Sequence, residues 1–160
     1  MVPARRVAHL AKRFFGSLAR GAPADEAWAI AQLTPGEQAL WARMSDPDRR
    51  HAVGVARAVA SDERAVTAAA LLHDVGKIES GLGTVARVGA TIAGAVRGRD
   101  RWWGGRVGAY LHHDELGATL LERAGSDALT IAWAREHHLP PERWTVPREI
   151  GLALKAADDD

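Results

Sequence analysis

Apolar residues recur every three or four positions along most of this 160-residue chain, and no stretch shows the regular alternation of a β-strand. The pattern therefore predicts an all-α fold, a compact bundle of many helices. Residues 98–105, with three glycines and two tryptophans, are predicted to form a loop. The expected helices cover residues 3–19, 24–32, 36–44, 46–60, 61–76, 82–97, 106–111, 114–124, 127–137 and 147–158.

Several expected helix boundaries carry residues that favour helix ends. Thr34 and Pro35 introduce the helix at 36–44, and Asp46 followed by Pro47 is typical of an N-cap with proline in the first turn. Gly76 is expected to weaken or end the helix that begins near Ser61, either as a C-cap or to permit close approach of a substrate.

The first 20 residues are predicted to form a basic amphipathic helix. Its apolar positions at helical spacing are Val7, Leu10, Phe14 and Leu18. We expect this helix to pack on the surface of the domain, and the less favoured alternative is contact with a membrane surface. The segment is too rich in charge to span a bilayer and lacks the long apolar run of a signal peptide. We therefore expect a cytoplasmic protein whose residues 1–160 form one domain.

Composition narrows the choice of partners and ligands. Hydrophobic residues make up 47% of the chain, which is enough for a sizeable core, and the net charge of +1 gives no reason to expect a nucleic-acid polymer as partner. The chain has no cysteine, which excludes disulfides and thiolate metal sites and fits a reducing compartment. Any bound metal must therefore use nitrogen and oxygen ligands.

The stretch AALLHDVGKI places an imidazole and a carboxylate directly after a run of apolar residues. In a helix, His73 shares a face with Ala69 and Ala70, and Asp74 shares one with Ala70 and Ile78. Both side chains should be substantially buried. A buried carboxylate is costly unless it is paired, hydrogen-bonded or bound to a metal, so we expect a cation beside Asp74.

Other ligand-type residues also interrupt apolar helical faces. One buried histidine is ordinarily a core residue bonded to a carbonyl or carboxylate, but the whole set favours a metal site. Its members outside the central stretch are His51, His113, His137 and Asp158. Neutral imidazoles with carboxylates suit Mn, Fe, Co, Ni or Zn. For Asp159 and Asp160, the alternative to a role near the metal is a solvated acidic tail.

The order of these residues over positions 46–158 resembles the H…HD…D pattern of the HD-domain superfamily of metal-dependent phosphohydrolases. LLHDVGKI looks like the central helix of that family. YLHHDELGATLL looks like its HPEIGAELL-type segment, which aligns His113 rather than His112, and WAREHHLPPERW resembles the HHE-type segment that follows. The resemblance implies an HD-domain-like helical bundle with one or two divalent transition-metal ions.

The resemblance also implies roles for individual residues. The implied ligands of one metal are His51, His73, Asp74 and Asp158. The implied ligands of a second metal are His113, His137 and His138, with Asp74 bridging the two ions. Asp74 and Lys77 are implied as the catalytic pair, with Lys77 on the substrate phosphate. His113 and His138 are also expected to contact the substrate. In a site with one metal, His113 and His137 would instead hydrogen-bond the substrate or fill the core.

Two differences from motifs of characterised family members narrow the range of expected substrates. LPPERW replaces the DGxGYP continuation of cyclic-di-GMP phosphodiesterases, and HDVGKIE differs from the HDxxED core of guanosine tetraphosphate hydrolases. We therefore expect hydrolysis of another small phosphomonoester or nucleotide by a metal-activated water. The alternatives are an HD fold that binds a ligand or partner without turnover, and the oxygenase chemistry that some HD-like folds support.

Overall fold

The structure is a computed structural model that describes residues 23–81 and 105–159. Within these residues it contains eight α-helices, two 3-10 helices and no strand, which confirms the all-α prediction. The elements are α2 (Pro23–Ala31), α3 (Pro35–Trp41), α4 (Asp46–Val59), α5 (Arg64–Leu72), η1 (Val75–Glu79), α7 (Gly105–Leu111), α8 (His113–Ala124), α9 (Ala128–Glu136), η2 (Pro141–Arg143) and α10 (Arg148–Asp159). The helices predicted at 3–19 and 82–97, and all but the last residue of the loop at 98–105, lie outside the described residues.

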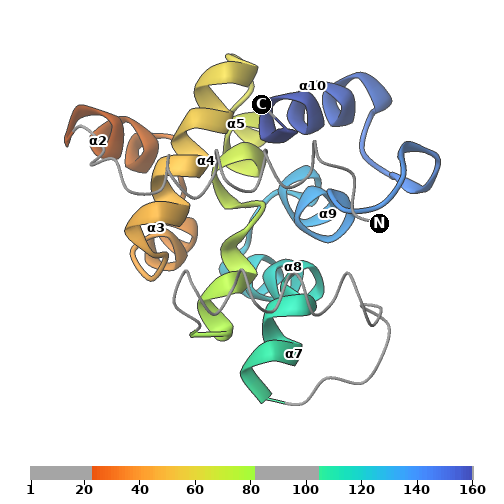
Figure 1. The fold of residues 1–160 in the computed structure, drawn as a ribbon. Helices are drawn as coiled ribbons and strands as arrows, with labels where there is room; N and C mark the ends of the chain where they lie inside the picture. The colour runs from red at the N-terminus through yellow and green to blue at the C-terminus, as the bar shows by residue number, and fades with distance from the viewer. Residues whose placement is uncertain (1–22, 82–104, 160) are drawn as a thin grey trace, which may run out of the picture.

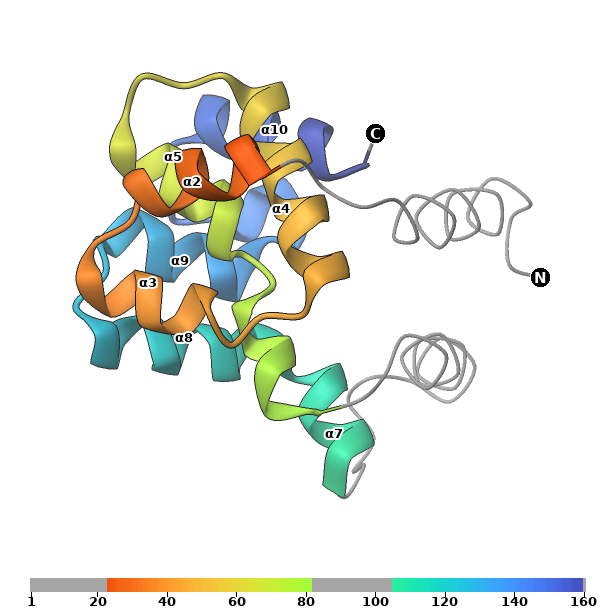
Figure 2. The same cartoon turned by 90° about the vertical axis from the view of Figure 1, so that its left-hand side faces the viewer.

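Helix α5 forms the centre of the core. It packs against α4 on one side and α9 on another, while α10 lies along α4 and α8 lies along α9 (Figures 1 and 2). The inner turns of α5, from Ala68 to Leu72, are fully buried. Three consecutive alanines in this stretch carry only a methyl group, which leaves room for neighbouring helices to pack closely. His73 and Asp74, which directly follow α5, therefore lie in the interior.

Two helix starts follow local capping chemistry, and one prediction was wrong in detail. Thr34 caps α3 in a capping box with Glu37, as its place before Pro35 suggested. The N-cap of α4 is Ser45 rather than Asp46, and the Ser45 hydroxyl accepts a hydrogen bond from the backbone nitrogen of Asp48 at 3.4 Å. Asp46 is the first helical residue, where its negative charge still favours the helix N-terminus.

The central helix ends earlier than the sequence pattern predicted. Helix α5 stops at Leu72; His73 keeps helical backbone angles, but Asp74 has φ −99° and ψ 8° and leads into the 3-10 helix η1. The predicted alignment of Asp74 with Ala70 and Ile78 on one α-helical face is therefore wrong. Burial of the pair is confirmed, since His73 is 1% and Asp74 4% exposed.

Gly76 accounts for the path of η1. A Cβ atom at this position would lie 1.9 Å from the carbonyl oxygen of His113 and 2.6 Å from the backbone nitrogen of Gly117. The backbone of η1 thus rests directly on the backbone of α8, which only glycine permits. Gly76 serves this close packing and is not the C-cap of α5, which is His73.

No helix among the described residues is long and apolar enough to cross a membrane.

Candidate metal centre

Seven side chains converge at one place, three from helices α4, α8 and α10 and four from residues that directly follow α5 and α9. His51 and Asp158 come from positions 107 residues apart, and His51 Nε2 lies 2.9 Å from Asp158 Oδ1. The structure brings together all seven residues that the sequence suggested as ligands. They are His51 (α4), His73 and Asp74 (after α5), His113 (α8), His137 and His138 (after α9), and Asp158 (α10).

The first group of donors has two imidazoles and two carboxylates. His73 Nε2 lies 3.5 Å from Asp74 Oδ2 and 3.5 Å from Asp158 Oδ1, so it faces both acids. Donor atoms of His51, His73 and Asp74 all lie within 4.8 Å of one another, which is close enough for one ion to contact them together.

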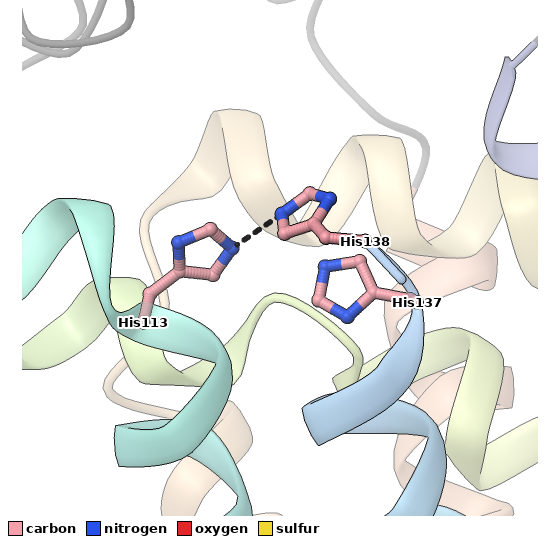
Figure 3. A group of neighbouring side chains, drawn as sticks. All are labelled: His113, His137 and His138. Atoms are coloured by element: carbon pink, nitrogen blue, oxygen red, sulfur yellow. Dashed lines mark hydrogen bonds between the residues drawn. The ribbon is translucent and has the colours of Figure 1, made fainter. Parts of the chain in front are cut away.

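The second group consists of three histidines (Figure 3). His113 projects from the first turn of α8, and His137 and His138 follow the end of α9; His138 Nε2 lies 3.2 Å from His113 Nε2. Their donor atoms also lie within 4.8 Å of one another. His137 is buried and His138 is exposed, as expected for adjacent residues whose side chains project in different directions. This group therefore reaches from the core to the surface.

Asp74 connects the two groups. Its Oδ2 faces His73, whereas its Oδ1 lies 3.2 Å from His113 Nε2 and 3.8 Å from His137 Nε2. One carboxylate with its two oxygens turned to two sets of imidazoles has the arrangement of a bridging ligand. The same Asp74 Oδ2 also contacts the ammonium group of Lys77, which is the cation expected beside this buried acid.

The tautomers of two buried histidines are set by the backbone. His73 Nδ1–H donates to the carbonyl of Ala70 at 2.9 Å, and His137 Nδ1–H donates to that of Ala134 at 3.0 Å. In both rings Nε2 is buried and has no hydrogen-bond partner among the described residues. Backbone orientation of Nδ1 with Nε2 turned to a shared site is the usual arrangement of metal-binding histidines. The donors therefore fit a metal ion.

Electrostatics distinguishes these two rings. Burial lowers the pKa of His137 to about 3, with help from the neighbouring His73, so its imidazole is neutral. Burial also opposes charge on His73, but Asp74 and Asp158 outweigh it and raise the pKa above its ordinary value. A proton on His73 Nε2 occupies the same place between two carboxylates that a metal ion would take.

The Asp74 carboxylate is held in its charged form. Burial alone would raise the pKa of Asp74, yet Lys77, His73 and His113 together hold it well below its ordinary range. Because a metal ligand must be deprotonated, this arrangement favours binding of a cation over the full neutral pH range.

Glu136, a buried acid outside the two donor groups, binds the segment that leads into α10. Glu136 accepts hydrogen bonds from the backbone nitrogen and the hydroxyl of Thr145, each at 2.6 Å. Trp144 Nε1 donates to the carbonyls of Glu136 and Leu139, each at 3.0 Å. These contacts orient α10 and so place Asp158. The sequence reasoning missed Glu136, although its spacing of three residues from the buried Trp133 puts it on the inward face of α9.

The C-terminal acids differ from one another. Asp158 is buried in the cluster, four residues after the fully buried Leu154. Asp159 is exposed and pairs with Lys155 Nζ at 2.9 Å, and Asp160 lies outside the described residues. Lys155 also lies 3.8 Å from Asp158 Oδ2, a contact that the sequence reasoning did not consider. The only signal for it in the sequence is a spacing of three residues from Asp158.

The first donor set, with two imidazoles and two carboxylates, and the second, with three imidazoles and the shared Asp74, both suit divalent transition metals. Comparison with curated proteins and with solved structures found no match. The family model for the HD domain matches residues 49–159, which include every donor residue of both groups. This match covers well over half of the chain and agrees with the all-helical fold. The chain therefore belongs to the HD-domain superfamily of metal-dependent phosphohydrolases.

Proposed function

We propose that this protein hydrolyses a small phosphomonoester or a nucleotide with the help of one or two divalent transition-metal ions. The observation that carries the proposal is the pair of buried Nε2 atoms of His73 and His137, which face opposite oxygens of Asp74 while Nδ1 of each ring is bound to the backbone. Membership of a superfamily of phosphohydrolases supports the reaction class.

In this proposal the two donor groups hold separate ions. His51, His73, Asp74 and Asp158 would hold the first ion. His113, His137 and His138 would hold the second, together with the shared Asp74. A bound ion lowers the pKa of a coordinated water toward neutrality and polarises the phosphoryl group.

Lys77 and Asp74 form the catalytic pair of the proposed site. The Lys77 ammonium group contacts Asp74 Oδ2 at the edge of the first donor group, and its side chain is only partly buried. A phosphate at this edge receives a positive charge that offsets the charge developing on its oxygens during reaction. The contact with Asp74 holds Lys77 in place beside the donor groups. In a protein with a single ion, His113 and His138 would donate hydrogen bonds to the phosphate instead of holding a second ion.

Phosphate release from a substrate panel tests this proposal. Protein reconstituted separately with Mn, Fe, Co, Ni and Zn is mixed with phosphomonoesters and nucleotides, and metal content is measured by elemental analysis. We expect His73→Ala to lose most of its metal and its activity. Lys77→Ala should keep its metal and lose most of its activity. His112→Ala is the matched control, because His112 is exposed and belongs to neither donor group.

The outcomes separate the competing functions. A wild-type protein that binds metal and ligand without releasing phosphate would be a binding module of the HD fold. Substrate oxidation dependent on oxygen, without phosphate release, would indicate oxygenase chemistry. A folded wild type that retains no metal after reconstitution would refute the metal centre itself.

A further inference from the structure

Lysine is rare in this chain, and its placement is not even. Only three of the 21 basic residues are lysines, namely Lys12, Lys77 and Lys155, and all the others are arginines. Lys12 lies outside the described residues. The other two lysines each contact a carboxylate of the candidate metal centre.

The two contacts have the same local construction. Lys77 lies three residues after Asp74, and Lys155 lies three residues before Asp158. Asp158 turns Oδ1 toward His51 and His73, and its Oδ2 lies 3.8 Å from Lys155 Nζ. Each carboxylate in the first donor group therefore has an ammonium group at its side.

The position of His73 relates these two lysines to one site. Its Nε2 lies 3.5 Å from both carboxylates, so each ammonium group is one carboxylate away from the same ring nitrogen. Lys77 stands on the Asp74 side and Lys155 on the Asp158 side. Both ammonium groups therefore border the first donor group, one beside Asp74 and the other beside Asp158.

Lys155 is available to a ligand. Its side chain is 31% exposed, and its closer partner, Asp159, is largely exposed to solvent. An exposed ion pair of this kind contributes only about 0–1 kcal/mol, so an incoming anion can compete for the ammonium group. A lysine also has a flexible stem and a compact charge, which lets it turn from Asp159 to a nearby anion.

We propose that Lys155 binds a second anionic group of the substrate, so that the site acts on a small phosphomonoester that also carries another phosphate or a carboxylate. This inference rests on the proposed phosphohydrolase function. The scissile phosphate lies by Lys77 and the second anion lies by Lys155. The competing explanation is structural: a lysine near the C-terminus of α10 offsets the helix dipole and the charges of Asp158 and Asp159.

Pairs of substrates that differ by one anionic group distinguish these explanations. Adenosine 5′-monophosphate is compared with adenosine 3′,5′-bisphosphate, and glycerol phosphate with 3-phosphoglycerate, using the ratio of kcat/KM within each pair. The wild type should prefer the member with the second anionic group in at least one pair by about tenfold, which corresponds to about 1.4 kcal/mol. The nucleotide pair tests a second phosphate, and the glycerol pair tests a carboxylate.

Variants of Lys155 should change this ratio and not the metal content. In Lys155→Ala and Lys155→Gln the preference should fall to about one, and Lys155→Arg should retain part of it. Asp159→Asn removes the competing partner of Lys155 and should keep or increase the preference. Arg148→Gln is the matched control for a lost charge, because Arg148 is an exposed basic residue on the same helix, and it should leave the ratio unchanged.

The same ratio of kcat/KM values shows which results would contradict the inference. If Lys155→Ala lowers activity or metal content equally for both members of a pair, the lysine is structural and the inference is wrong. It is also wrong if the wild type shows no preference in either pair. If no substrate releases phosphate, the proposed function fails, and calorimetric binding of the same two adenosine nucleotides then tests Lys155 alone. Equal affinities in the wild type and in Lys155→Ala would contradict a role of Lys155 in binding the second anion.

Discussion

Replacing Gly76 with alanine should damage both the fold and the metal centre, because its Cα rests on the backbone of α8. The new Cβ would lie 1.9 Å from the carbonyl oxygen of His113 and 2.6 Å from the backbone nitrogen of Gly117. Close carbon–oxygen contacts are about 3.3 Å long, so η1 and α8 must separate by about 1.4 Å. Both collision partners are backbone atoms, which no side-chain rotation can relieve.

The size of the effect follows from this geometry. Overpacking of a core costs about 1–3 kcal/mol, and we expect the upper end here because backbone segments must move. For a chain of this length that loss lowers Tm by about 6–12 °C. The same movement separates Asp74 Oδ1 from His113 Nε2, now 3.2 Å apart. We therefore expect metal affinity to fall about 10- to 100-fold, the range that follows loss of groups that orient metal ligands.

Thermal unfolding of the metal-free protein and calorimetric metal titration measure the two effects. Gly54→Ala is the matched control, because Gly54 is exposed in the middle of α4 and a Cβ there would meet no atom within 4 Å. Alanine is the better helix former, so this control should stabilise the protein by up to about 1 kcal/mol. A Gly76→Ala protein with the Tm and metal affinity of the wild type would refute the close packing of η1 on α8.

Three further predictions concern the donor residues themselves. Asp158→Ala should lower metal affinity at least about tenfold in a calorimetric titration, whereas Asp159→Ala should not, and equal affinities would remove Asp158 from the ligands. His113→Ala should keep one ion per chain and lose a second by elemental analysis; loss of both or of neither would contradict two separate donor groups. Burial would raise the pKa of Asp74, but Lys77 holds it well below the ordinary range. The charged carboxylate thus stabilises the metal-free fold above the unfolded pKa of about 3.9, and this stability is lost as pH falls through the lower folded value. In Asp74→Asn the free energy of unfolding should therefore depend less steeply on pH in the acid range than in the wild type. An unchanged pH dependence would contradict the shifted pKa.

The hydrophobic pattern of the sequence was sufficient to predict an all-helical fold and the burial of the central side chains, but it placed the end of the central helix too late. Periodicity is a local property, so it predicted α8, α9 and α10 to within a residue or two. It also predicted burial of His73, Asp74 and Asp158, because each follows apolar residues at helical spacing. The residue types and their order were enough to indicate the family, which the match over residues 49–159 confirms.

The position of Asp74 between two donor groups was decided only by the tertiary structure. The pattern placed it on a continuous helix, but α5 ends at Leu72, η1 packs on α8 through Gly76, and the two oxygens of Asp74 face different sets of histidines. The contacts of Lys155 and the role of Glu136 in placing α10 also depend on partners brought together by folding. Helical periodicity records only which side of a helix faces inward. The distances between donor atoms depend on how closely separate helices pack, and in this protein backbone contacts at glycines help to set that packing.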